Sequence, residues 1–147
     1  MSVVKSRRSQ SKVEFETLFF TVADNVDNLV EHHFYVSATT LNLNREFIAS
    51  RGSAMERLTD DLLYYIKIAN SIYPQCMAEF EERRIAMDKA IGVCFAIMTN
   101  YQRVMLRLRI NDNKYTNDIL TLVRMINSLK AWRKSDNKLK ETLKNKV

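Results

Sequence analysis

The sequence predicts an all-α protein: a four-helix up-down bundle with one long connection between the first and second helices. Its 147 residues include only two glycines and one proline, fewer than the hairpin turns of a β-sheet protein require. Along most of the chain, apolar residues recur at alternating steps of three and four, the spacing of one face of an α-helix. The length suits one hydrophobic core, so we expect residues 1–147 to form a single domain.

The first two helices are expected from about Lys12 to His32 and from Ser53 to about Pro74. The first apolar stripe contains Phe15, Phe19, Val22, Val26 and Leu29. The second contains Met55, Leu58, Leu62, Tyr65, Ala69 and Ile72. A capping box at Ser53, in the stretch SAME, predicts the start of the second helix, because the Ser53 hydroxyl and the Glu56 carboxylate can accept from its first free amides.

The third helix is expected from about Cys76 to Arg109 and has the longest stripe. Its members are Met87, Ile91, Cys94, Met98, Tyr101, Met105 and Leu108. A seam of this length is typical of a helix that keeps one side toward its partners in a bundle, and core packing explains it better than a Met-rich binding groove. Gly92 lies within this helix but off the seam, which predicts the close approach of a neighbouring backbone.

The fourth helix is expected to run from about Tyr115, with an apolar stripe of Ile119, Leu122, Ile126 and Leu129, and to end within the stretch Lys130–Lys138. Helices joined by short turns pack as antiparallel neighbours, which predicts an up-down array. The connection over residues 33–52 is too long and too apolar for a simple loop. It is either a crossover packed on the bundle or an arm that docks on another subunit.

The net charge of +6 comes entirely from the two ends of the chain. Residues 1–12 contain four bases and no acid, and residues 130–147 contain seven bases and two acids. We therefore expect a basic N-terminal arm over residues 1–11 and a basic C-terminal tail over residues 135–147. Basic ends on a near-neutral body are typical of polyanion-binding proteins, and also of segments that only increase solubility.

Several bases are grouped on the expected helices. Arg103 and Arg107 share one face near the end of the third helix, because they are four residues apart. On the fourth helix, Arg124 precedes a denser group formed by Lys130, Arg133 and Lys134, which continues through Lys138. The helix dipole favours cations in the last turn and explains two or three of these bases, but not the whole series.

Trp132, the only tryptophan, lies within this basic group. It follows Leu129 by three residues and flanks the apolar stripe, so we expect a half-buried structural anchor that holds the end of the fourth helix on the bundle. The alternative is a platform on which a nucleic-acid base stacks.

The sequence contains no recognisable catalytic constellation. There is no glycine-rich phosphate loop, no Cys/His pair at catalytic spacing and no Glu-x-x-His pair of the kind found in di-iron bundles. Cys76 and Cys94 are 18 residues apart in one helical pattern, or ~27 Å along a straight helix, so we expect no disulfide. His32 and His33 are the only histidines, which argues against a metal site. We expect a protein that is not an enzyme and needs no cofactor or metal.

The N-terminal stretch MSVVKSRRSQSK has no apolar run after its bases, which argues against a secretory signal. No stretch is long and apolar enough to predict a transmembrane helix. We therefore expect a cytoplasmic protein whose partners include neither a membrane nor a small-molecule substrate.

Four stretches of the chain resemble a bacterial family of four-helix bundles. They are VVKSRRSQSK at Val3–Lys12, IANSIYP at Ile68–Pro74, EERRIAMDKAIGVCFAI at Glu81–Ile97 and KAWRKSDNK at Lys130–Lys138. The family contains the accessory variability determinant (Avd) proteins of diversity-generating retroelements and the rRNA intervening-sequence proteins.

The resemblance to the Avd proteins implies a bacterial or phage-encoded accessory protein that assembles as a homopentameric barrel with a basic surface. Such a protein partners a reverse transcriptase and binds its RNA template and cDNA, while the polymerase performs the copying. The resemblance implies phosphate contacts from Arg103, Arg107, Arg124, Lys130, Arg133, Lys134 and Lys138, assisted by Lys5, Arg7 and Arg8. The resemblance to the rRNA intervening-sequence proteins implies instead a structural or interaction bundle with no direct nucleic-acid role.

Overall fold

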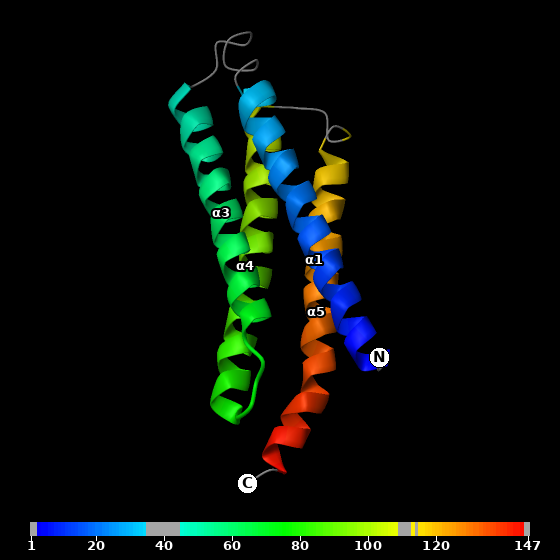
Figure 1. Cartoon of the computed structure of the whole chain (residues 1–147). Helices are drawn as coiled ribbons and strands as arrows, with labels where there is room; N and C mark the ends of the chain where they lie inside the picture. The colour runs from blue at the N-terminus through cyan, green and yellow to red at the C-terminus, as the bar shows by residue number, and fades with distance from the viewer. Residues whose placement is uncertain (1–2, 35–44, 109–112, 114, 146–147) are drawn as a thin grey trace.

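The computed structural model describes residues 3–34, 45–108, 113 and 115–145, and this part of the chain is a four-helix bundle that contains no strand (Figure 1). The helices are α1 (Val3–Asn28), α3 (Arg45–Ser71), α4 (Met77–Leu108) and α5 (Thr116–Lys144), and a short π-helical segment, η1 (Leu29–Phe34), continues α1. Each helix runs antiparallel to the next, and α1 and α4 each pack between α3 and α5. The predicted all-α class and four-helix bundle are confirmed.

The core is formed by the apolar sides of all four helices. In α1 every residue of the predicted stripe is buried. In α4 the buried line includes Met87, Ala90, Cys94, Ile97, Tyr101 and Val104, whereas Met98 and Met105 of the predicted stripe are only partly buried. The buried line itself keeps a seven-residue repeat, with steps of three and four from Met87; the predicted stripe instead took Met98 and Met105, which lie on the flank of this line, in place of Ile97 and Val104.

Helix α3 begins at Arg45, eight residues before the predicted start. The predicted capping box is therefore wrong, since Ser53 lies inside a helix and its side chain is exposed. Gly52 costs about 1 kcal/mol in a helix interior, but Phe47 packs against the core one turn earlier and holds this segment helical. The segment 45–52 of the predicted connection is thus helical. Residues 35–44, which carry the question of a crossover or an arm, lie outside the described residues.

Both ends of the chain also differ from the expected boundaries. Helix α1 begins at Val3 rather than near Lys12, so residues 3–11 of the expected N-terminal arm are helical. Helix α5 continues ten residues beyond Lys134, so residues 135–144 of the expected tail are helical too. Neither segment contains glycine or proline, and the buried side chains of Asp136 and Leu143 hold the last turns of α5 against the bundle.

Gly92 does not contact a neighbouring backbone within the chain. A Cβ atom built on it would meet nothing within 4 Å, so the predicted close approach is wrong for the single chain. Cys76 is exposed and Cys94 is buried, and both are free thiols. Within the described segments, no helix combines the length and the apolar composition that crossing a membrane requires.

Candidate nucleic-acid interface

Trp132 lies at the junction of three helices. Its ring centroid is 5.2 Å from that of Phe15 in α1, and the guanidinium carbon of Arg83 in α4 lies 4.6 Å from the ring centroid. The indole packs against the core and is half-buried. A tryptophan in this position stabilises the bundle through buried area and a cation–π contact, and offers little free ring face for a nucleic-acid base.

Asp136 and Arg83 form a buried ion pair next to this tryptophan. The Arg83 Nε atom lies 3.1 Å from Asp136 Oδ2, and the two side chains are only 5% and 7% exposed. Arg83 also donates a hydrogen bond of 3.3 Å to the carbonyl oxygen of Ile72. Two charges are tolerated here because each is matched by the other and by additional polar contacts.

Two more contacts tie the same part of α5 to α4. Arg133 Nη1 lies 2.8 Å from Asp88 Oδ1. Arg84 donates hydrogen bonds of 3.2 Å to the Arg133 carbonyl and of 2.5 Å to Asn137 Oδ1. Arg133, predicted to contact nucleic acid, is therefore engaged within the chain, although its side chain remains 35% exposed.

The outward side of α5 carries exposed bases, of which Lys130 has its ammonium 5.9 Å from the ring centroid of Phe95 in α4. Lys130, Lys134 and Lys138 are exposed and recur every four residues, and Arg124 is exposed further up the helix. We call these four residues the α5 basic face. Between Ile119 and Lys140 the only acid is Asp136, which is buried. The basic face therefore extends over ~21 Å of helix without an exposed carboxylate of its own.

Three further predicted bases lie at the same end of the bundle as the lower part of this face. Lys5, Arg7 and Arg8 belong to the first turns of α1, whose backbone runs beside the C-terminal half of α5 (Figure 1). The side chains of these three residues lie outside the described part of the structure.

Arg103 and Arg107 are not brought together with Lys134 and Lys138. They lie near the C-terminal end of α4, which faces the start of α5 and thus the opposite end of the bundle from Lys138. There they line an open depression of about 510 Å³ with Phe47 and Leu106, and the Arg107 guanidinium carbon is 5.7 Å from the Phe47 ring centroid. The predicted set thus divides into two separate groups within one chain.

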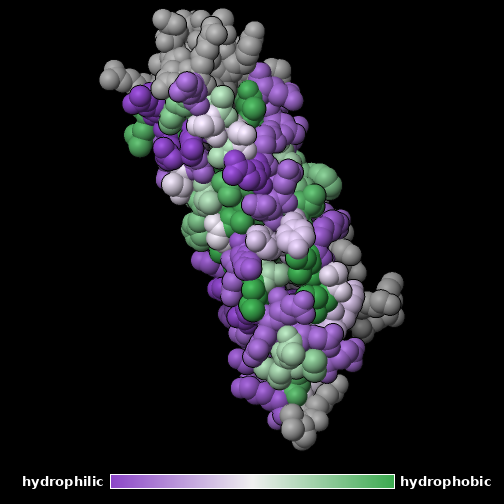
Figure 2. All heavy atoms as spheres, turned by 90° about the vertical axis from the view of Figure 1, so that its left-hand side faces the viewer, coloured by the Kyte–Doolittle hydropathy of each residue, from purple (hydrophilic) through white to green (hydrophobic). Residues whose placement is uncertain are grey.

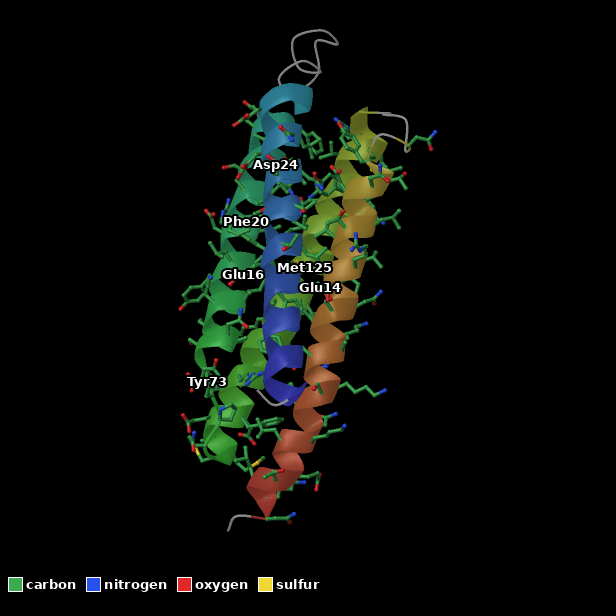
Figure 3. The ribbon with its side chains drawn as sticks, turned by 45° about the vertical axis from the view of Figure 1, so that its right-hand side comes forward. Glu14, Glu16, Phe20, Asp24, Tyr73 and Met125 are labelled. Carbon is green, nitrogen blue, oxygen red and sulfur yellow. The ribbon has the colours of Figure 1, made fainter. Side chains whose placement is uncertain are left out.

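The opposite side of the bundle is acidic. Residues 13–31 contain five acids and no base; Figure 3 shows Glu16 and Asp24 on the side of α1 that faces α3, with Phe20 between them, whereas Glu14 lies on the side next to α5. Helix α3 adds Glu56, which shares a hydrogen bond with Asp27 of α1, and Asp60, whose charge acts on Glu56. We call this group the acidic seam. Counting the charges helix by helix reveals the acidic seam in the sequence. Counting them only for the two ends of the chain and for the segment between them does not.

Apolar side chains on the bundle surface are dispersed. On the face seen in Figure 2 they lie in small groups separated by hydrophilic residues. The most exposed large apolar residues of the described chain include Phe20, Tyr64, Ile85, Phe95 and Leu106. The α5 basic face is therefore distinguished by charge and not by apolar area.

The buried thiol and phenol groups stay protonated at neutral pH, because burial raises their pKa values. Burial raises the pKa of the Cys94 thiol to about 12. Burial, assisted by the charge of Asp118, raises the pKa of Tyr115 to about 12 and that of Tyr101 still further. Tyr101 donates a hydrogen bond of 3.1 Å to Asp118 Oδ2. Over the described residues, no three His, Cys, Asp or Glu side chains form a group that could hold a metal ion.

Comparison with known proteins returned no relative: no family model, no curated protein and no solved structure matches the chain. A function for this chain is therefore inferred from the geometry of the bundle and from the resemblance of its sequence stretches.

Proposed function

We propose that this protein is a non-catalytic accessory subunit that binds nucleic acid through the α5 basic face. The observation that carries the proposal is the burial of Asp136, which leaves the outward side of α5 between Ile119 and Lys140 with bases and no exposed acid. Lysine and arginine side chains spaced along a helix can contact successive phosphates of a nucleic acid, since the two spacings match loosely. The binding energy of these contacts comes mainly from counterion release. Such a face binds without reading sequence.

The resemblance to the Avd proteins makes the proposal more specific. In that role the nucleic acid is the RNA template and cDNA of a diversity-generating retroelement, and the protein partner is a reverse transcriptase. Assembly into a pentamer would repeat the basic face five times, so that a modest patch on one chain becomes a strong polyanion site. Arg103 and Arg107, at the other end of the chain, would form a second contact region in such an assembly.

Quantitative binding to short nucleic acids tests the basic face. We expect the full chain to bind mixed-sequence single-stranded RNA or DNA in a fluorescence anisotropy assay. Replacing Lys130, Lys134 and Lys138 together by Gln should weaken binding at least tenfold at low salt. The slope of log affinity against log salt concentration should fall by about 2, because three phosphate contacts are lost at ~0.7 each. Circular dichroism should show unchanged helicity, since all three side chains are exposed.

A charge-matched variant provides the control. Arg57, Lys67 and Lys89 are exposed bases on α3 and α4, away from the α5 basic face, and their replacement by Gln removes the same net charge. We expect this variant to keep most of the affinity. An equal loss in both variants would contradict a localised site. No binding by the unmodified chain would favour the structural bundle of the rRNA intervening-sequence type. Whether a neighbouring gene encodes a reverse transcriptase, and whether such an enzyme co-purifies with this chain, tests the polymerase partner separately.

A further inference from the structure

Phe95 of α4 is an exposed aromatic ring beside the α5 basic face. Its side chain is 48% exposed, and the Lys130 ammonium lies 5.9 Å from its ring centroid. That distance is at the outer limit of a cation–π contact, so the lysine lies near the ring and leaves much of it accessible. The other exposed aromatic side chains of the described segments lie elsewhere: Phe20 on α1, Tyr64 on α3 and Tyr73 in the turn after α3.

The surface of α4 around Phe95 has room for a flat ligand. Gly92 lies one turn before it on the same side of the helix, and a Cβ atom built on Gly92 would meet nothing within 4 Å. Thr99, which is small and exposed, lies one turn after it. Residues three or four apart share a side of a helix. These two neighbours therefore leave the Phe95 ring open along the outer side of α4.

The charge around Phe95 favours a polyanion. Residues 89–108 of α4 contain no acid, and neither do residues 119–135 of α5. Asp88, the acid that precedes the first of these segments, is paired with Arg133. A ligand that lies over Phe95 and along α5 therefore meets bases and apolar groups, and no unpaired carboxylate from these segments.

We propose that the α5 basic face binds single-stranded nucleic acid, with a base stacked on Phe95 and the neighbouring phosphates held by Lys130 and Lys134. This inference rests on the nucleic-acid function proposed above and names the form of the ligand. An aromatic ring beside a row of cations suits a single strand, because every unpaired base has a flat face to stack. In a duplex the bases are stacked on one another and offer the ring no free face. The stacking role considered for Trp132 thus falls to Phe95, because the indole packs against the core.

Fluorescence anisotropy with three probes tests the stacked base. The probes are a mixed-sequence single strand, the same strand annealed to its complement, and an abasic strand of the same length. Phe95→Leu should weaken binding of the full chain to the single strand about tenfold, the effect of losing one stacked base. Binding to the duplex and to the abasic strand should not change. The salt dependence should also stay the same, since no phosphate contact is lost.

Two further variants separate stacking from a general effect on the protein. Phe20→Leu is the matched control, because Phe20 is 66% exposed on α1, and this variant should bind all three probes as the unmodified chain does. Phe95→Trp should retain single-strand binding, and its added indole fluorescence should be quenched by the single strand and not by the abasic strand. Thermal melts of both Phe95 variants should stay close to that of the unmodified protein, since the ring is exposed.

The outcomes distinguish this inference from the function on which it rests. Unchanged single-strand binding in Phe95→Leu, or an equal loss for the abasic strand, would overturn the stacked base. The α5 basic face would still be supported if the variant that replaces Lys130, Lys134 and Lys138 by Gln bound weakly. No binding of any probe by the unmodified chain would overturn both proposals.

Discussion

Asp136 is the acid within the basic segment from Lys130 to Lys140, and its burial determines the charge of the surface around it. The partner Arg83 comes from α4 and lies under the ring of Trp132. The pair therefore joins two helices and also removes a carboxylate from the outward side of α5. One residue thus contributes both to the stability of the bundle and to the character of its proposed binding face.

Removal of Asp136 should destabilise the protein strongly. Asp136→Ala leaves the Arg83 guanidinium buried without its counterion, so we expect a loss of about 3 kcal/mol or more in the free energy of unfolding, measured by urea denaturation. Asp88→Ala breaks the half-exposed pair with Arg133 and should cost less than about 1 kcal/mol. The double variant Arg83→Met/Asp136→Leu should recover most of the loss. Equal losses for the two single variants would show that the Arg83–Asp136 pair has no special role.

Helix α5 is the element on which the proposed function depends. Its inward side from Trp132 to Asn137 is fastened to α1 and α4, and its outward side presents lysines at every turn. The stretch KAWRKSDNK alternates between these two roles because residues three or four apart share a side of a helix, while intervening residues face away. The mixture of an aromatic, an acid and four bases is thus resolved by helix geometry.

Trp132→Ala should lower the free energy of unfolding by roughly 3 kcal/mol, because it removes the contact with Phe15 and uncovers Arg83. Thermal or urea denaturation checks this value, with Leu120→Ala as an exposed control that should cost less than about 0.5 kcal/mol. Nucleic-acid binding should be retained at temperatures where the variant is folded. A negligible loss of stability combined with a loss of binding would instead show that the indole stacks on bases.

At the scale of the whole molecule, the charge is segregated between opposite sides of the bundle. The acidic seam between α1 and α3 lies across the core from α5. Within it, burial raises the pKa of Glu56 to about 7 from an ordinary value of 4.5, and a hydrogen bond with Asp27 and the charges of Asp60 and Glu31 add to the effect. Lys67 of α3 pairs with Glu16 in the seam; the seam's remaining carboxylates would repel phosphates, which favours the α5 basic face as the site of the proposed polyanion binding.

The raised pKa of Glu56 predicts a pH dependence of stability. The folded protein binds a proton at Glu56 more tightly than the unfolded chain does. The stability that this proton contributes is therefore fully present below about pH 4.5 and is lost as the pH rises through about 7. The free energy of unfolding of Glu56→Gln, relative to that of the unmodified protein, should therefore increase between pH 4.5 and pH 8. We expect this increase to be roughly 1 kcal/mol at low salt, after solvent screening. Thermal melts at both pH values check this. Asp61→Asn, also on α3, should show no such gain, and a gain of equal size there would contradict the assignment.

The sequence by itself determined the helical class, the number of long helices and most of the core. These follow from local chemistry, because the scarcity of glycine and proline and the three–four spacing of apolar residues act within one helix at a time. The α1 stripe is buried as predicted, and the α4 stripe differs because Ile97 and Val104, rather than Met98 and Met105, face the core.

Only the tertiary structure decided the helix ends, the partner of Asp136 and the grouping of the bases. The sequence places Arg83 and Asp136 more than fifty residues apart, and nothing local shows that α4 and α5 align so that they meet. The same alignment separates Arg103 and Arg107 from Lys134 and Lys138, because antiparallel helices bring the end of one beside the start of the next. A periodic pattern shows which side of a helix is apolar, but only packing determines which charges lie together.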